Sequence, residues 1–281
     1  MTANTANTAN TANTANTANV GNAGNGIDPG SGWCFADRAS FPFVDDPLVN
    51  RDPPYAATTG YADRYWSPIW FAWRLLGEFV GSNWQTIQLR APIDHQYEIP
   101  RLQRLARFER ADAADEIVAQ KDEFVSYFMG LLGATPGSHP QTYRLMHFAN
   151  LVGAFMSMHF KAQHSRRRPS HIAPSLFPPV QVPGHPAYPS GHAAQAHLIR
   201  RCTLSILPAA ATPIVRDNLK ALAKRIARNR EIAGLHFNDD SHGGQELANT
   251  MSQFLDADLT TNPPTRPAYA TLFKAAQAEW A

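Results

Sequence analysis

Residues 139–163 read HPQTYRLMHFANLVGAFMSMHFKAQ. Apolar residues recur there every three or four positions, so one side of a helix would be apolar along its length; they include Tyr143, Met146, Phe148, Leu151, Val152, Phe155 and Met156. The proline-rich segment between Pro169 and Pro189 ends this pattern, because proline interrupts helical hydrogen bonding. The stretch predicts one long helix and indicates a helical protein.

Further helices are expected on both sides of this stretch. Helical spacing of apolar residues, together with proline, glycine and serine at the boundaries, predicts helices over 63–80, 113–132, 190–208, 213–228, 240–255 and 267–280. Strand-like alternation of valine and isoleucine is scarce. We therefore expect an all-α fold, a helical bundle.

The N-terminal region has a different character. Residues 2–19 are six copies of Thr-Ala-Asn, which offer almost no apolar surface to offset the entropy of ordering. We expect a disordered tail over 1–26 and a single helical catalytic domain over 27–281. Within that domain, residues 27–61 mix aromatic residues with proline, aspartate and glycine, and they predict an irregular arm.

Bulk composition excludes several classes of protein. The net charge of +2 argues against a nucleic-acid-binding surface. The first 26 residues lack the features of a signal peptide, and no run reaches the roughly 20 apolar residues of a membrane span. These features predict a cytoplasmic protein with no integral membrane segment. The two cysteines, Cys34 and Cys202, are too few for a disulfide scaffold, although one bridge is compatible with them.

Three polar segments carry the candidate chemistry, and the first reads KAQHSRRRP over 161–169. Pro169 biases the preceding residue away from the helical conformation, so Lys161 should lie at a helix end and Arg168 on the turn after it. Arginine offers a planar fork to two oxygens, and lysine adds a compact charge. Alone, the segment also fits a solvated basic cluster at a helix C-terminus.

The second segment reads HPAYPSGH over 185–192. Ser190 is a typical N-cap, and Gly191 and His192 would open the helix that follows. A helix start presents free N–H groups to an anion, and His192 can exchange a proton beside it. Alone, the segment fits an ordinary capped helix better than an anion site.

The third segment reads REIAGLHFNDD over 230–240. If the backbone is helical from His236, Asp240 lies one turn further on and accepts a hydrogen bond from the Nδ1–H of His236. This contact leaves Nε2 of His236 as a nucleophile or ligand, and Arg230 adds another forked donor. The alternative is a surface histidine in an ordinary helical ion pair.

Together and in this order, the segments resemble a known superfamily. It comprises type 2 phosphatidic acid phosphatases, bacterial class A acid phosphatases and vanadium-dependent haloperoxidases, which share Lys-x6-Arg-Pro, Pro-Ser-Gly-His and Ser-Arg-x5-His-x3-Asp. The resemblance covers about residues 140–256, and Asn229 stands where the family usually has serine. It implies a helical bundle of the acid phosphatase/vanadium haloperoxidase type.

The resemblance also implies residue roles. A phosphate or vanadate ion would be held by Lys161, Arg168, Ser190, Gly191 and Arg230. His236 would be the axial group, attacking phosphorus in a phosphatase or bonding vanadium in a haloperoxidase. His192 would be the acid/base, and Asp240 would orient His236.

Two activities fit these residues. The run 185–192 most closely resembles the vanadium bromoperoxidase version, which places His185 in the halide pocket. This favours a haloperoxidase that uses vanadate as cofactor and halide and hydrogen peroxide as substrates. The alternative is a soluble phosphatase that needs no cofactor and hydrolyses phosphomonoesters through a phosphohistidine at His236.

Other classes have less support. A zinc site built from histidines would lack the His-Glu-x-x-His pattern. A non-catalytic binding module would keep the anion site without turnover. The aromatic residues Trp66, Trp70 and Trp73 fit either a core or the face of a homodimer.

Overall fold

A computed structural model describes residues 67–93, 97–209 and 213–281. The tail predicted over 1–26 and the arm predicted over 27–61 lie outside the described residues, as does the beginning of the helix predicted from residue 63. The described residues form helices joined by turns and loops, with no β-strand among them. The predicted all-α class is therefore confirmed.

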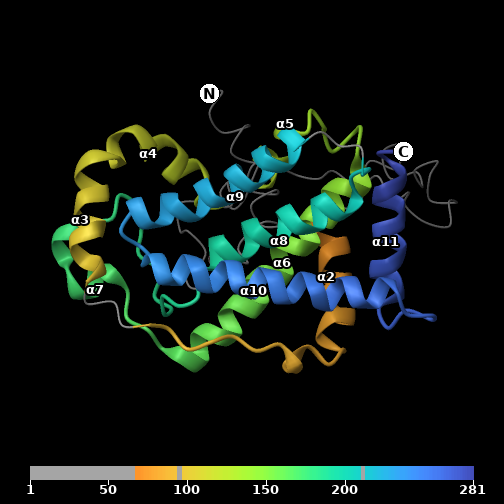
Figure 1. Ribbon diagram of the computed structural model, residues 1–281, viewed down its shortest axis with the longest axis horizontal. Helices are drawn as coiled ribbons and strands as arrows, with labels where there is room; N and C mark the ends of the chain where they lie inside the picture. The colour runs from red at the N-terminus through yellow and green to blue at the C-terminus, as the bar shows by residue number, and fades with distance from the viewer. Residues whose placement is uncertain (1–66, 94–96, 210–212) are drawn as a thin grey trace, which may run out of the picture. The chain divides into compact units, whose positions relative to one another are not determined.

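Four long helices form the centre of the described part (Figure 1). Helix α8, Gly191–Ile206, packs against α6, Pro140–His164, on one side and against α10, Asn238–Leu259, on another. Helix α9, Pro213–Ile232, also packs along α8. These helices confirm four of the predicted segments, with α9 and α10 each ending four residues later than expected and α10 beginning two residues earlier.

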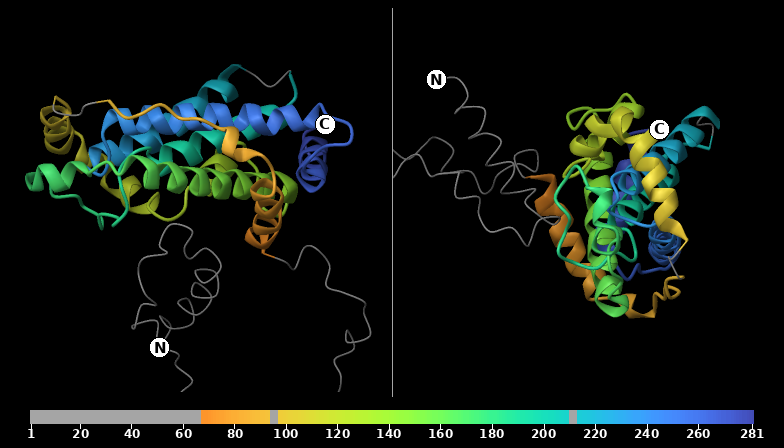
Figure 2. Two further views of the ribbon diagram at one scale, coloured as in Figure 1. Left: turned by 90° about the horizontal axis from the view of Figure 1, so that it is seen from below. Right: turned by 90° about the vertical axis from the view of Figure 1, so that its left-hand side faces the viewer.

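Two further helices pack on α6. Helix α2, Pro68–Val80, packs against it at an angle, and α11, Pro267–Ala278, lies across its N-terminal half and close to the C-terminal end of α10 (Figures 1 and 2). Buried aromatic residues fill the space between them, with the rings of Phe148 and Tyr269 5.3 Å apart and those of Phe79 and Phe155 6.2 Å apart. This packing is the main apolar core.

The predicted helix over 113–132 is wrong as a single element. The chain forms α4, Arg110–Ala119, and α5, Val125–Leu131, separated by a turn. Lys121 and Asp122 remain exposed in this turn, whereas Phe124 enters the core. The break follows from this change of environment, because one continuous helix would not present the charged pair to solvent and still bury Phe124.

A second apolar cluster supports the turn between α9 and α10. Helix α3, Glu98–Phe108, which the sequence did not predict, contributes Leu102 and Leu105 to it. From the turn come Leu235 and Phe237, which flank His236 in the chain. Packing on both sides of His236 thus fixes its backbone.

The short helix α7, Pro169–Ile172, and two 3-10 turns, Trp84–Thr86 and Pro174–Leu176, complete the described elements.

Two adjacent glycines bring α10 against the start of α8. A Cβ atom on Gly244 would lie 2.5 Å from the carbonyl oxygen of Ser190, and one on Gly243 would overlap the ring of Tyr188. The Ser190 N–H donates to the Asp240 carbonyl oxygen at 2.8 Å. The second and third polar segments therefore meet directly, because the glycines let the backbones approach.

Among the described residues, no helix has both the length and the apolar character needed to span a bilayer.

Candidate oxyanion site

Lys161 and Arg168 lie where Pro169 predicted them, at the end of α6 and on the turn after it. Lys161 lies in the last turn, the helix ends at His164, and Arg168 is extended with φ −77° and ψ 154°. Both side chains are only 1% exposed. The ammonium group donates to the carbonyl oxygens of residues 186 and 187, both at 2.8 Å, and Nε of Arg168 donates to that of residue 185 at 2.9 Å. Both cations therefore hold the loop that leads to Ser190.

Arg230 lies in the last turn of α9 and is 1% exposed. Its Nη2 donates to the carbonyl oxygen of Ile117 at 2.7 Å. Its Nε and Nη1 are buried and have no hydrogen-bond partner among the described residues. Since an unsatisfied buried donor costs free energy, these two N–H groups are suited to a ligand that supplies oxygen atoms.

His236 is oriented by Asp240, although not through the helix that was expected. The expectation that the backbone is helical from His236 is wrong: Phe237 is the N-cap and α10 begins at Asn238. The Phe237 N–H donates to Oδ2 of Asp240 at 2.8 Å, and Nδ1 of His236 lies 3.3 Å from the same oxygen. A turn held by the N-cap thus replaces the helical i,i+4 geometry. Nδ1 carries the proton in this contact, which leaves the lone pair on Nε2.

The neighbours of His236 keep it neutral. Burial lowers its pKa well below the usual value, and the nearby charges of Arg168 and Lys161 lower it further. Nε2 of His236 lies 3.4 Å from Nη1 of Arg168. Burial raises the pKa of Asp240 to about 6, with Arg166 acting against this rise. Above that pH a neutral imidazole therefore faces an ionised carboxylate.

Two cations of the site remain charged at neutral pH despite their burial. Desolvation lowers the pKa of Arg168 and of Arg230 to about 10 in each case. Burial, followed by the charge of Arg168, lowers the pKa of Lys161 well below its usual value, whereas Asp240 acts to raise it. Three basic groups kept from water with little countercharge form a strong attraction for an anion.

Ser190 caps α8 as predicted. It is fully buried, and its Oγ accepts a hydrogen bond from the Ala193 N–H at 3.4 Å. Gly191 opens the helix, and a Cβ atom there would lie 3.4 Å from Oγ of Ser157. This is an ordinary van der Waals distance, and the first turn of α8 presents its backbone N–H groups as any helix start does.

His192 meets the turn between α4 and α5. Its Nε2 lies 3.0 Å and 3.2 Å from the carbonyl oxygens of Gln120 and Lys121, so Nε2 carries a proton. Burial lowers the pKa of His192 to about 3, and the charge of Arg230 contributes to this effect. The ring packs at 5.4 Å from that of Phe124. Nδ1 of a neutral His192 is therefore the nitrogen available for proton transfer.

His185 also lies beside the basic groups. Its Nδ1 is 3.1 Å from Nη2 of Arg168 and 3.2 Å from the Pro186 carbonyl oxygen. Burial lowers its pKa to about 4, with Lys161 and Arg168 acting in the same direction. The structure thus gathers the predicted residues from three segments, and we call the following set the cationic cluster: Lys161, Arg168, Ser190, Gly191, His192, Arg230 and His236.

Sequence reasoning missed Arg166. It is 7% exposed, and its Nη1 donates to Oδ2 of Asp239 at 2.8 Å and to Oδ1 of Asp240 at 3.0 Å. Its Nη2 donates to the Ile93 carbonyl oxygen at 3.0 Å. The run of three arginines could have indicated a supporting residue. A buried arginine needs a tertiary partner, and the Asp239–Asp240 pair later in the chain could supply one.

Asn229, the departure from the family pattern, joins two helices behind Arg230. Its Nδ2 donates to Oε2 of Glu116 at 2.9 Å and to Oε1 of Gln120 at 2.8 Å. These bonds hold α9 against the end of α4, next to the carbonyl groups that His192 contacts. Asn229 therefore makes polar contacts of its own at this position.

The arrangement has the chemistry of an oxyanion site. Its cations and a helix start favour a compact anion, and its neutral imidazole has Nδ1 held by Asp240 and the lone pair of Nε2 beside Arg168. Among the described residues, no group of three or more His, Cys, Asp or Glu is arranged to hold a metal ion.

Comparisons with known proteins add one likeness. No family model matches the chain, and no curated protein matches it. A solved structure that does match is a transmembrane phosphatidylglycerolphosphate phosphatase of the PAP2 type from Bacillus subtilis. The match has 15% sequence identity and a TM-score of 0.34, and it covers 68% of this chain and 96% of that chain. At these values the likeness assigns no activity.

The cytoplasmic location expected from the sequence requires correction. The structure that matches is that of a transmembrane enzyme. The inference rested on segments that the sequence lacks, and missing segments do not place a protein in a compartment. That expectation is therefore withdrawn.

Proposed function

We propose that this protein is a phosphatase that hydrolyses phosphomonoesters through a covalent intermediate on His236. The observation that carries the proposal is the state of that histidine. Nδ1 is held by Asp240 at 3.3 Å, and Nε2 faces Arg168 at 3.4 Å. A neutral imidazole with a fixed tautomer is a nucleophile that is ready to attack a bound phosphate.

The basic groups would bind the phosphate oxygens. The unpartnered Nε and Nη1 of Arg230 supply two donors, and Arg168 and Lys161 supply further charge. Charge-assisted hydrogen bonds contribute roughly 1.5–3 kcal/mol each. Donors held in place by the protein stabilise the pentacoordinate transition state, because they do not need to reorganise as charge moves onto the oxygens.

The reaction would proceed in two steps. In the first, Nε2 of His236 bonds to phosphorus while the P–O bond to the leaving group breaks, and His192 gives its Nδ1 proton to the departing oxygen. In the second, water attacks phosphorus, His192 takes a proton from that water, and the P–N bond breaks to release phosphate. His192 is neutral when the site is considered alone, because its pKa is about 3. The charge of a bound phosphate would favour the protonated form that the first step needs.

A second activity, halide oxidation with bound vanadate, is favoured by one contact. His185, which the resemblance assigns to the halide pocket, lies 3.1 Å from Arg168. The residues that would hold phosphate fit vanadate equally, since both ions are tetrahedral, and His236 would be the vanadium ligand. Bound vanadate would supply the activation of peroxide.

One paired assay separates the two activities. The full chain is tested for turnover of p-nitrophenyl phosphate and, after addition of vanadate and hydrogen peroxide, for oxidation of bromide. We expect phosphatase turnover that vanadate inhibits. The variant His236→Ala should lose at least about a thousandfold in kcat, and the matched variant His171→Ala, which changes an exposed histidine, should keep it.

Three results would change the conclusion. Bromide oxidation without ester hydrolysis would establish the second activity instead. Absence of both activities, with phosphate binding retained in His236→Ala, would indicate a binding module. Equal loss in His236→Ala and His171→Ala would contradict the role of His236.

A further inference from the structure

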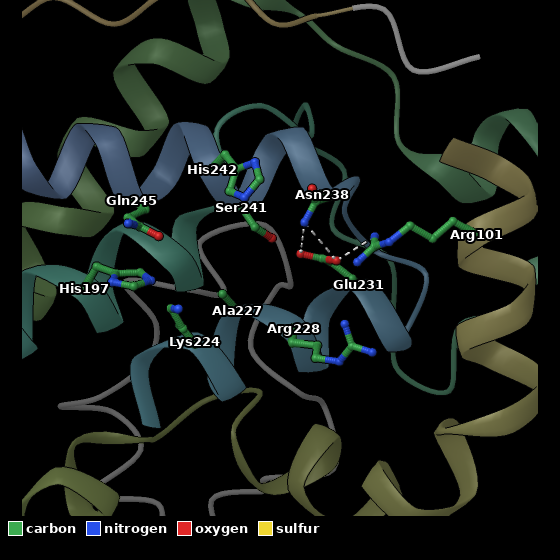
Figure 3. Close-up of a pocket in the computed structure, with 10 residues that line it drawn as sticks. All are labelled: Arg101, His197, Lys224, Ala227, Arg228, Glu231, Asn238, Ser241, His242 and Gln245. Carbon is green, nitrogen blue, oxygen red and sulfur yellow. Dashed lines mark hydrogen bonds and ion pairs between the residues drawn. The ribbon is translucent and has the colours of Figure 1, made fainter. Parts of the chain in front are cut away.

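A polar pocket lies between α3, α8, α9 and α10. It has a volume of about 240 Å³, several times the roughly 30 Å³ that one water molecule occupies in the liquid. Figure 3 shows side chains from α3, α8, α9 and α10 around it. We call it the back pocket, and its lining is Arg101, His197, Lys224, Ala227, Arg228, Glu231, Asn238, Ser241, His242 and Gln245.

Two buried polar side chains in the back pocket have no partner among the described residues. His197 is 2% exposed, and its Nδ1 makes no hydrogen bond; Ser241 is 7% exposed, and its Oγ makes none. In Figure 3 the ring of His197 and the hydroxyl of Ser241 both extend toward the middle of the pocket. Since buried polar groups are nearly always satisfied, these atoms are suited to a bound ligand.

The charges around the pocket favour an anion. The single lining carboxylate, Glu231, accepts hydrogen bonds from Arg101 at 2.8 Å and from Asn238 at 3.3 Å, so its charge is already compensated. Arg228 is paired with Glu109, which lies outside the lining. Lys224 has no carboxylate within ion-pair distance among the described residues. An uncompensated positive charge therefore remains beside the unsatisfied donors.

The pKa of His197 reflects both its burial and the positive charges nearby. Burial lowers the pKa of His197 to about 3, and the charges of Arg200, Arg201 and Lys224 act in the same direction. Burial, assisted by these charges, therefore keeps the imidazole neutral. A neutral imidazole still carries one ring N–H, which His197 can donate to an anion in the pocket.

The back pocket shares no residue with the cationic cluster, although the chain links them. Glu231 follows Arg230 on α9, and Ser241 follows Asp240 on α10. Neighbouring side chains on a helix point about 100° apart, so each helix serves both sites from different faces. The two sites can therefore be tested separately.

We propose that the back pocket is a second anion site, which binds a compact oxyanion of the phosphate or sulfate type. Lys224 supplies positive charge, and Ser241 and His197 donate hydrogen bonds to the anion from the hydroxyl and from a ring N–H. Arg228 and His242 border the same space. The proposal does not depend on catalysis at His236.

Histidine NMR on the full chain tests this site directly. Protein labelled with 15N is titrated with sulfate, and separately with phosphate, at pH 7 and constant ionic strength, while the imidazole resonances are followed. We expect saturable shifts of His197 and His242. Their resonances are assigned with the variants His197→Gln and His242→Gln. Shifts of His236 report the cationic cluster independently, so failure of one site is not mistaken for failure of the other.

A matched pair of lysine variants tests whether Lys224 supplies the charge that binds the anion. Lys224→Met should weaken anion binding at His197 by roughly tenfold, because it removes one charge-assisted contact. Lys220→Met removes an exposed lysine one turn earlier on α9 and should leave that affinity within about twofold. The His236 shifts should be the same in both variants.

Two outcomes would overturn the proposal. In one, His197 and His242 do not shift at any concentration of sulfate or phosphate up to the limit of solubility, which would mean that the pocket holds only water. In the other, Lys224→Met and Lys220→Met weaken the response equally, which would mean that the anions act only by screening surface charge. Ser241→Ala provides a second check, because it removes a hydroxyl without changing charge and should also weaken binding.

Discussion

The apolar core around α6 and the cationic cluster at its C-terminal end bury side chains in different ways. In the core, Phe148 carries no polar side-chain atom and packs its ring 5.3 Å from that of Tyr269. In the cluster, Arg230 is as deeply buried, but two of its donors have no partner among the described residues. Burial of apolar surface stabilises a fold, whereas burial of unsatisfied charge costs stability. The difference agrees with the proposal that the core stabilises the fold and that the cluster binds an anion.

The largest expected effect tests the core side of this comparison. Phe148→Ala should lower the free energy of unfolding by about 3–5 kcal/mol, because it leaves a cavity in close-packed surroundings. Its kcat per folded molecule should stay close to wild type. Chemical denaturation gives the first quantity, and phosphatase assays well below the unfolding midpoint give the second.

Phe177→Ala is the matched control for this change. Phe177 is 79% exposed, so its removal should cost less than about 1 kcal/mol. If Phe148→Ala lost activity while remaining folded, the division between core and cluster would not hold.

The next effect tests the cluster side. Arg230→Met should reduce kcat/KM for a phosphomonoester by about a hundredfold, because it removes donors that would bind the transferred group. The free energy of unfolding should stay the same or rise by up to about 3 kcal/mol, since a buried cation with unsatisfied donors is replaced by an apolar side chain of similar length. Steady-state kinetics and chemical denaturation measure the two quantities.

Arg216→Met serves as the control, because Arg216 lies on the exposed side of the same helix. It should change neither quantity appreciably. A loss of stability in Arg230→Met as large as that in Phe148→Ala would show that Arg230 is a structural residue.

The smallest effect concerns pH. Activity should fall as the pH drops through about 6, because protonation of Asp240 removes the acceptor that orients His236. Arg166 stabilises the ionised form of Asp240, so Arg166→Gln should raise the pKa of Asp240. The acid limb of the kcat/KM profile should then move to higher pH by about one to two units.

Arg167→Gln changes the exposed neighbour and should leave the pH profile in place. A uniform loss of activity in Arg166→Gln, with an unchanged acid limb, would contradict the link between Arg166 and Asp240.

The sequence predicted the parts of this structure that local signals determine. Pro140 and Pro267 stand in the first turns of α6 and α11, and Ser190 caps α8, so these helices were found close to their true limits. Helix α3 was missed, and the segment 113–132 was wrongly joined, because their limits depend on which side chains the rest of the fold buries. Periodicity does not carry that information.

The cationic cluster was predicted from spacing within three short segments, whereas its supporting contacts were not. Arg166 pairs with Asp239 and Asp240 more than 70 residues away in sequence. His192 contacts the carbonyl oxygens of Gln120 and Lys121. Every residue has a backbone carbonyl group, so the sequence does not indicate which of them a side chain will contact. Such partners are defined only by the tertiary structure.

The most direct test of the account is diffraction from crystals of this protein soaked in tungstate. Tungstate is a tetrahedral oxyanion whose metal gives a strong anomalous signal. The account predicts an ion bound within hydrogen-bond distance of Nη1 of Arg230 and of Arg168, with Nε2 of His236 directed at the tungsten. Tungstate bound elsewhere on the protein, with none among these three side chains, would contradict it.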